Sequence, residues 1–280
     1  MRHDSWKTRL FRFAHLQAYG QPARLATASQ TSRTILGRTL YKRKTMTHSS
    51  HWLNQIEGEV RTNELMSLHT SLRVGGPADL YLLPQHLDDL RLILRNQKDR
   101  ALFIFGEGSN LLISDRGIRG TVVSLKRGFK KISTPEFFTD ENGEERALLK
   151  VDAGVKMSYL VKYAAKYSLT GIENLVGVPG SLGGAVVMNA GAEGTETGDV
   201  IKSVTVLQPD GELVTFGRDE LVFNYRKTIF PEQTGIIVQA ELELRKENIT
   251  KIQDRIDRHL KRRSQTQPLS LPNSGSVFKN

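Results

Sequence analysis

The chain has 280 residues, of which 38% are hydrophobic, and a formal net charge of +10. That length and apolar content suffice for the buried core of one large domain or two modest ones. The chain contains no cysteine, which excludes disulfides, thiolate metal sites and a cysteine nucleophile.

The positive charge is concentrated at the N-terminus. The first 50 residues contain ten Lys and Arg and one acid, Asp4, a balance of +9, so the other 230 residues carry only +1. No periodicity is sustained there, and we expect residues 1–50 to be a basic, disordered extension. Three interpretations stay open: a true start at Met46, an organellar targeting segment, or an interaction arm. Because the remaining chain is nearly neutral, we expect no nucleic-acid partner.

From residue 51 onward the sequence alternates between helical and strand-like periods. Apolar residues at spacings of three and four predict helices over 87–96 and 157–167. Apolar runs bounded by Gly, Pro, Asp and Asn predict strands over 79–83, 101–105, 111–114, 121–125, 147–154, 203–216 and 235–244. The "PDG" at 209–211 predicts a hairpin turn inside the sixth of these runs.

A last helix is predicted over 247–264. Ile249, Ile252, Ile256 and Leu260 would form its apolar face, and Lys and Arg gather in its final turn, where they complement the helix dipole. Many strands and few helices indicate an α+β fold. No apolar run approaches the roughly 18 residues of a membrane span, so we expect no membrane association.

The first of two glycine-rich stretches is "FIFGEGSNLLISD", residues 103–115. It is no dinucleotide fingerprint, because the third glycine would fall at Leu111 and no helix follows. A turn between two strands remains. Its backbone N–H groups either form an anion-binding concavity or belong to a plain hairpin, and both readings stay open. The candidate residues are Gly106, Glu107, Gly108, Ser109 and Asn110.

The second stretch, "GVPGSLGGAVVMNAGA" at 177–192, contains five glycines in sixteen residues. Each interior glycine costs about 0.5–1 kcal/mol relative to alanine, so this density indicates that something approaches the backbone closely. A pyrophosphate with an attached flat ring would explain it, and a glycine-rich, close-packed helix start is the alternative. The candidate residues are Gly177, Pro179, Gly180, Ser181, Gly183, Gly184, Asn189 and Gly191.

Five motifs carry a family resemblance. They are "TSLRVGGPADLYLLP" (70–84), "FGEGSNLLISDRGIRG" (105–120), "GIENLVGVPGSLGGAVVMNAGA" (171–192), "FNYRKTIF" (223–230) and "NSGSVFKN" (273–280). In this order and with these separations they resemble the UDP-N-acetylenolpyruvoylglucosamine reductases, and most of all their shorter type II class. The resemblance runs from about residue 50 to the last residue.

The resemblance implies a two-part FAD-binding module of the vanillyl-alcohol-oxidase (PCMH) type, with subdomains over 51–125 and 126–246. Residues 247–280 would begin a third, substrate-binding domain. A monomer in the bacterial cytoplasm would use NADPH and non-covalently bound FAD, without a metal, to reduce UDP-N-acetylglucosamine enolpyruvate to UDP-N-acetylmuramate for peptidoglycan. The implied FAD contacts also include Arg73, Val74, Gly75 and Gly76.

The resemblance also implies roles for individual residues. Arg226 matches the arginine beside the enolpyruvyl carboxylate, Tyr225 its neighbour, and Ser276 the proton donor, while Lys279 and Asn280 would contact the substrate. The chemistry agrees with these residue types. Hydride addition builds negative charge that a guanidinium can stabilise, and a serine hydroxyl donates a proton only when it is well placed.

The sequence departs from the family at its C-terminus. Family members continue for some tens of residues, and that stretch supplies a catalytic glutamate and much of the third domain. We therefore interpret the chain as C-terminally truncated. The alternative function is a catalytically inactive flavin-binding protein.

Overall fold

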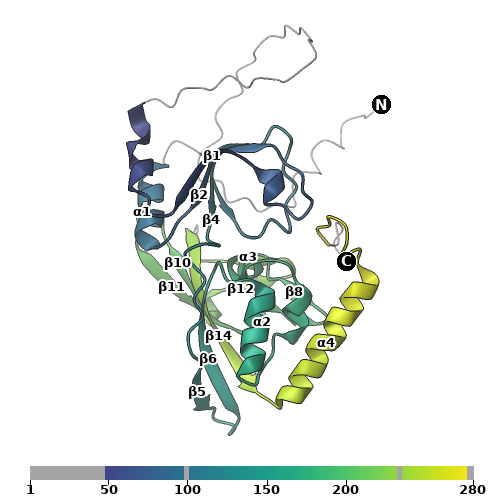
Figure 1. Cartoon of the computed structure of the whole chain (residues 1–280). Helices are drawn as coiled ribbons and strands as arrows, with labels where there is room; N and C mark the ends of the chain where they lie inside the picture. The colour runs from purple at the N-terminus through teal and green to yellow at the C-terminus, as the bar shows by residue number, and fades with distance from the viewer. Residues whose placement is uncertain (1–47, 98–100, 232–234, 276–280) are drawn as a thin grey trace, which may run out of the picture.

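The structure is a computed structural model that describes residues 48–97, 101–231 and 235–275. It has two lobes, each built on its own β-sheet, and the first lobe lies above the second in Figure 1. The prediction for the basic extension falls almost entirely outside the described residues. Within the described ranges, no helix is long and apolar enough to cross a membrane.

A mixed four-stranded sheet forms the first lobe, in the order β1-β2-β4-β3. β1 is antiparallel to β2, whereas β2 and β3 are each parallel to β4. Alternation along β2 directs Leu80 and Leu82 into the main core with α1, and Tyr81 and Leu83 into a smaller cluster. The elements are η1 (His48–Gln55), β1 (Glu59–Leu65), η2 (Met66–Leu68), β2 (Pro77–Leu83), α1 (Leu87–Asn96), β3 (Leu102–Phe105) and β4 (Ile118–Ser124).

The predicted strand over 111–114 is wrong. These residues form a loop, and the strand that follows β3 is β4, which is parallel to it, so the hairpin alternative is excluded as well. Leu112 is 79% exposed, while Ile113 packs on the smaller cluster. The Ser114 carbonyl accepts a hydrogen bond of 2.9 Å from the Gly76 N–H. The apolar run therefore braces a neighbouring loop instead of pairing in the sheet.

The second lobe contains a six-stranded antiparallel sheet in the order β11-β10-β14-β6-β5, with β7 also paired to β14. The predicted "PDG" turn is confirmed, since the Gln208 N–H donates to the Glu212 carbonyl at 2.8 Å between β10 and β11. The helix predicted over 157–167 is α2 (Met157–Lys166). The strands are β5 (Glu136–Thr139), β6 (Glu145–Asp152), β7 (Leu169–Thr170), β10 (Ile201–Leu207), β11 (Leu213–Gly217) and β14 (Ile236–Lys246).

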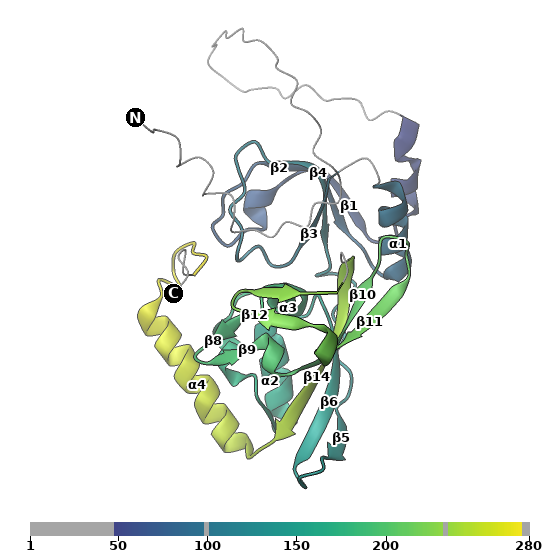
Figure 2. The same cartoon turned by 180° about the vertical axis from the view of Figure 1, so that it is seen from behind.

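Short elements and a long helix complete this lobe. They are η3 (Glu173–Gly177), α3 (Leu182–Val187), β8 (Gly191–Ala192), β9 (Thr195–Glu196), η4 (Thr197–Asp199), η5 (Arg218–Glu220), β12 (Val222–Asn224), β13 (Lys227–Ile229) and α4 (Ile249–Thr266). Helix α4 runs along the outside of the lobe, and its C-terminal end is directed toward the first lobe (Figures 1 and 2). Domain boundaries after residues 125 and 246 stay predictions.

The apolar face of α4 is narrower than the sequence pattern predicts. Ile252 and Ile256 are buried, whereas Ile249 and Leu260 are 50% and 40% exposed. The helix therefore contacts the core over only part of its length.

Candidate cofactor and substrate site

A cleft of about 890 Å³ opens between the two lobes. The loop after β3 lines it from the first lobe. The η3–α3 segment, the β12–β13 turn and α4 line it from the second. Its volume lies within the range of sites that enclose small molecules and cofactors, about 300–1,000 Å³.

The two glycine-rich stretches meet across this cleft. The Ser109 hydroxyl donates to the Pro179 carbonyl at 2.7 Å, and Lys156 Nζ lies 3.2 Å from Glu107 Oε2. Two segments 70 residues apart therefore form one continuous wall. The sequence-predicted cofactor residues that line it are Gly106, Glu107, Gly108, Ser109, Asn110, Gly177, Pro179, Gly180, Ser181, Gly183, Gly184 and Gly191.

Glycine is needed at different positions of this wall for different structural reasons. At Gly180 and Gly184 a Cβ atom would meet nothing nearer than a serine hydroxyl at 3.7 Å. At Gly183 it would lie 3.0 Å from the Ala153 side chain, and at Gly191 it would lie 2.9 Å from the Thr195 carbonyl oxygen. Gly183 and Gly191 thus allow the chain to pack on itself. Gly180 has a φ of +151°, which already favours glycine, and together with Gly184 it leaves open space in the cleft for a bound group that approaches the backbone.

Arg73, Val74, Gly75 and Gly76 are not among the cleft-lining residues, although they were predicted to contact the cofactor. The two glycines pack on the segment that follows the first glycine loop, since a Cβ at Gly75 would lie 2.9 Å from the Ile113 side chain. A Cβ at Gly76 would come within 2.0 Å of the Asp115 carbonyl oxygen, so glycine is needed there for backbone packing. The contact of Arg73 to Gly76 with the cofactor stays a prediction.

Asn189 also lies behind the lining, and it is fully buried. Its side-chain nitrogen donates to Glu196 and to the Asn224 carbonyl, and its side-chain oxygen accepts from the Gly198 N–H at 2.9 Å. Its φ of +39° is uncommon for a residue other than glycine. Asn189 thus ties the β8–β9 hairpin to the β12–β13 hairpin, which carries two further predicted residues.

Tyr225 and Arg226 form the turn between β12 and β13, and both line the cleft. The Arg226 guanidinium lies 5.1 Å from the Tyr225 ring centroid, and its Nη1 donates to the Gly191 carbonyl at 3.2 Å. Arg226 has a φ of +57°, a strained backbone of the kind found at functional sites. It forms no ion pair with any described residue, so an anionic ligand can bind it. Ser276, Lys279 and Asn280 lie outside the described residues.

Sequence reasoning missed several polar residues of the cleft, among them Lys126, Glu193, His259 and Arg263. Glu193 lies in the β8–β9 turn, and its carboxylate is 2.9 Å from His259 Nδ1 on α4. A usable signal exists in the sequence. Arg255, His259 and Arg263 recur at intervals of four, which places them near one another along one side of a helix.

The residues of the cleft fit a nucleotide cofactor. Glu107 Oε1 is buried and has no hydrogen-bond partner among the described residues, so it can accept a bond from a ligand hydroxyl or N–H group. Backbone amides of two glycine loops and open space at Gly180 and Gly184 complete the cradle. Fold and site together have the features of a nucleotide-cofactor protein, with a cleft between two lobes that suits such a group.

Comparison with known proteins gives the class. A family model described as FAD binding domain matches residues 78–217. A solvent-stable cholesterol oxidase shares the fold, with a TM-score of 0.51 and 16% identity over 68% of this chain and 38% of that one. The predicted α+β fold with a FAD-binding module is thereby confirmed, and the chain is an FAD-dependent flavoprotein.

Comparison also gives the family. The UDP-N-acetylenolpyruvoylglucosamine reductase of Syntrophomonas wolfei is 41% identical over 222 residues, 79% of this chain and 71% of that protein. That of Caldanaerobacter subterraneus is 37% identical over 80% of this chain and 71% of that protein. The crystal structure of the Thermus caldophilus enzyme aligns with a TM-score of 0.65 and 30% identity, over 80% of this chain and 75% of that one. The chain belongs to the UDP-N-acetylenolpyruvoylglucosamine reductase family.

Proposed function

We propose that this protein reduces UDP-N-acetylglucosamine enolpyruvate to UDP-N-acetylmuramate, with NADPH as reductant and FAD bound non-covalently in the cleft. One observation carries the proposal. Two glycine loops from different lobes, joined by the Ser109–Pro179 hydrogen bond, face the same cleft as the Arg226 guanidinium. A phosphate-binding cradle thus lies beside a cation suited to a carboxylate.

The cofactor would be held by the lining residues of both loops. The backbone N–H groups around Ser109 and those of Gly180 and Ser181 suit the diphosphate, whereas the N–H groups of Leu182 and Gly183 already donate to Val155 and Ala153. The open positions Gly180 and Gly184 leave room for the ring system. Arg73 to Gly76 and Asn189 would support this wall from behind. Bound FAD would accept a hydride equivalent from NADPH and supply one to the enolpyruvyl double bond.

Arg226 would bind the substrate carboxylate and stabilise the negative charge that develops next to it. The Gly191 carbonyl and the Tyr225 ring hold the guanidinium in place, so little reorganisation is needed when charge appears. Tyr225 would also contact the substrate at the cleft mouth, where its side chain is half exposed. Among the described residues, Tyr225 and Arg226 would thus contribute to catalysis mainly by stabilising the developing negative charge.

Ser276 would protonate the carbon next to the carboxylate, and Lys279 and Asn280 would contact the substrate. These three residues lie outside the described ranges. Support comes from the preceding residues, since Ser274 and Gly275 line the cleft. Ser276 follows these two residues directly in the sequence, and general acid catalysis would require its hydroxyl to reach the substrate.

We further propose that the protein acts as a monomer in the bacterial cytoplasm, without nucleic acid. NADPH and UDP-sugars are highly charged metabolites that do not cross membranes freely, which favours the compartment that synthesises them. The near-neutral balance of residues 51–280 gives no basis for binding a phosphate backbone. Size-exclusion chromatography with light scattering measures the oligomeric state, and a stable dimer would contradict this part.

The proposal is tested by spectroscopy of the full chain. Purified protein should show flavin absorbance that bleaches with NADPH under anaerobic conditions and returns when UDP-N-acetylglucosamine enolpyruvate is added. Bleaching without reoxidation by the substrate would favour the inactive flavin-binding alternative. Protein that stays colourless after incubation with FAD would overturn the proposal.

Arg226→Met tests the assigned charge. We expect kcat to fall by about 10²- to 10³-fold, the usual cost of removing one electrostatic stabiliser of the transition state. Arg218→Met is the matched control, because Arg218 also lies over an aromatic ring, 4.6 Å from the Phe223 centroid, but does not line the cleft. Equal loss of kcat in both variants would contradict the role of Arg226.

A further inference from the structure

Arg263 is a second cation of the cleft without an acidic partner. It projects from α4, its Nε donates to Gln267 Oε1 at 3.1 Å, and it forms no ion pair within the described part of the chain. Its Cδ lies only 3.0 Å from where a Cβ of Gly177 would stand. Burial lowers the pKa of its guanidinium, and no neighbouring acid offsets this. A half-buried cation without a counter-charge is unfavourable, unless a ligand supplies the negative charge.

The inward face of α4 changes its chemistry along the helix. Residues 252, 256, 259, 263 and 266 follow one another at spacings of four and three, so they share one face. Ile252 and Ile256 lie in the core, whereas His259, Arg263 and Thr266 line the cleft. The first half of the helix therefore anchors it, and the second half presents polar groups to a ligand.

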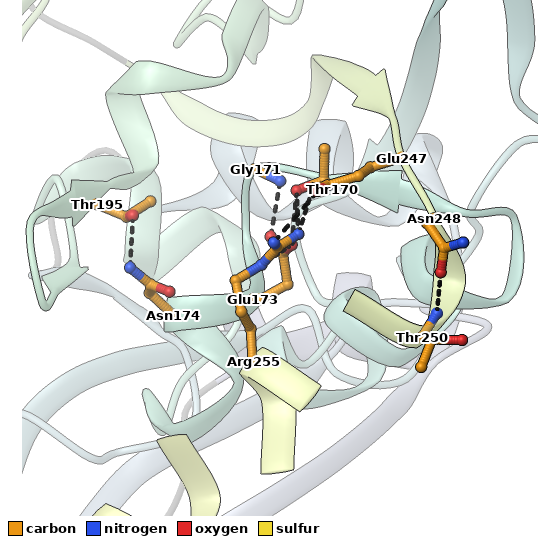
Figure 3. Close-up of polar contacts among 9 residues, drawn as sticks. All are labelled: Thr170, Gly171, Glu173, Asn174, Thr195, Glu247, Asn248, Thr250 and Arg255. Carbon is orange, nitrogen blue, oxygen red and sulfur yellow. Dashed lines mark hydrogen bonds and ion pairs between the residues drawn. The ribbon is translucent and has the colours of Figure 1, made fainter. Parts of the chain in front are cut away.

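A partly buried ion cluster fixes the anchored half (Figure 3). Glu173, whose side chain is only 5% exposed, accepts from Arg255 Nη2 at 2.7 Å and Nε at 3.0 Å. The same carboxylate accepts from the Thr170 hydroxyl at 2.6 Å and from the Gly171 N–H at 2.7 Å. Glu247 pairs with Arg255 from the other side. All partners of this cluster lie within the protein, so it holds no free group for a ligand.

The cluster and the cleft share the same two elements. Glu173 and Gly177 are the two ends of η3, and Arg255 and Arg263 lie eight residues apart on α4, about 12 Å along its axis. At the Glu173 end of η3, the ion pair with Arg255 holds α4 in place. At the Gly177 end, the Arg263 side chain of α4 packs on the glycine. The Glu193–His259 contact of 2.9 Å adds a tie between them. Movement of α4 relative to η3 would thus displace Arg263.

We propose that Arg263 binds a diphosphate group in the cleft, and that Glu173 and Arg255 are positioning residues that hold α4 at the required place. The proposal rests on the proposed function and deepens it. A guanidinium binds phosphate oxygens through two parallel N–H groups, and here it lies beside the Gly177 to Ser181 turn. FAD and a UDP-sugar both contain a diphosphate, so the test has an arm for each.

Arg263→Met in the full chain is the first variant. The dissociation constants of FAD and of UDP are measured, by quenching of flavin fluorescence and by calorimetry on the FAD-loaded protein. We expect a loss of at least about tenfold for one of them, since a charge-assisted hydrogen bond is removed. A loss for FAD assigns the cofactor diphosphate, and a loss for UDP alone assigns the substrate diphosphate. Arg263→Lys should recover only part of the affinity.

Both affinities unchanged within twofold would overturn the proposal and leave the proposed function intact. Wild-type protein that binds neither FAD nor UDP would overturn the proposed function, and this inference with it. The two failures are therefore distinguishable by the wild-type measurement alone.

Arg255→Met tests the positioning role. It should weaken the same ligand as Arg263→Met, and the double variant should be no weaker than Arg263→Met alone, because the first acts through the second. Arg146→Met is the matched control, since Arg146 pairs with Asp140, Glu144 and Glu243 away from the cleft. It should leave both affinities within twofold.

If Arg255→Met does not fold, Arg255→Lys replaces it, because lysine keeps the positive charge but loses the bidentate hydrogen bonds of the guanidinium. Losses from Arg255 and Arg263 variants that add fully would contradict the positioning role. The same holds if the Arg146 and Arg255 variants change ligand affinity alike.

Discussion

The two walls of the cleft are held in place by different means. In the first lobe, the Gly106–Asn110 loop is fixed by backbone contacts. A Cβ at Gly108, whose φ is +66°, would lie 2.2 Å from the His69 carbonyl oxygen, and the Ser71 N–H donates to the Gly108 carbonyl at 3.1 Å. In the second lobe, η3 and α4 are joined by the side-chain charges of Glu173 and Arg255.

This difference determines which perturbation each wall withstands. Backbone packing does not depend on charge, but it tolerates no added side chain. Ion pairs tolerate small changes of shape, but they depend on the charge of the carboxylate. The cleft thus has one wall held mainly by backbone packing and one wall held by side-chain charges.

Gly76→Ala should break the first wall, and it is the largest effect that we expect. The new Cβ would lie 2.0 Å from the Asp115 carbonyl oxygen and 2.7 Å from the Gly117 nitrogen, both of them backbone atoms that cannot move away cheaply. We expect the free energy of unfolding to fall by about 3 kcal/mol or more. Urea denaturation at neutral pH measures it.

Gly217→Ala is the control for that substitution. Gly217 has a φ of −69°, and the nearest atom to its Cβ position is a glutamate oxygen at 3.6 Å, so the change should stay within about 0.5 kcal/mol. A Gly76→Ala protein as stable as this control would show that the loop behind the first wall shifts easily. The contrast between the walls would then fail.

Acid should loosen the second wall. Burial raises the pKa of Glu173, but hydrogen bonds from Thr170, Arg255 and the Gly171 backbone lower it by a larger amount. The net pKa therefore lies below its ordinary value of 4.5. A lowered folded-state pKa means that the ionised carboxylate stabilises the fold above about pH 4.5, and that this contribution disappears as pH falls through the folded-state value.

Glu173→Gln isolates this contribution. At pH 7 the variant should be less stable than wild type by about 1–3 kcal/mol, because a charge-assisted hydrogen bond to Arg255 is lost. The difference should shrink below pH 4.5 as wild type becomes protonated. Denaturation curves at several pH values between 3.5 and 7 measure it. A difference that is independent of pH would mean that charge does not hold this wall.

Long periodic elements could be predicted from the sequence, because burial of one face imposes a spacing. The helices at 87–96 and 157–166 and the β10–β11 hairpin follow from such spacing. The run at 111–114 could not be assigned in this way, since four apolar residues fit a strand and a packed loop equally well. Its role depends on contacts with the distant Gly76, which no local pattern contains.

The parts of the candidate site that are built from backbone could be predicted from the sequence, whereas its single side chains could not. Clustered glycines marked both loops, although spacing alone did not separate Gly183, which packs on Ala153, from Gly184, which faces the cleft. The role of Arg226 was predicted from the family resemblance alone, because a tyrosine–arginine pair in a turn is common and indicates no function by itself. Arg263 was not predicted, because it lies among the Lys and Arg residues of the last helical turn, which a favourable interaction with the helix dipole already explains.

Gly184→Ala should produce the smallest change in stability, and one of opposite sign. The position lies inside α3, and a Cβ would meet only the Ser181 hydroxyl at 3.7 Å, so the FAD-free protein should gain about 0.5–1 kcal/mol from reduced backbone entropy. The same methyl group points into the cleft and should weaken FAD binding. Gly183→Ala is the neighbouring control, and it should lose stability against Ala153. Unfolding midpoints with and without FAD separate the two effects. If Gly184→Ala raises stability and leaves FAD affinity unchanged, this face of α3 does not contact the cofactor.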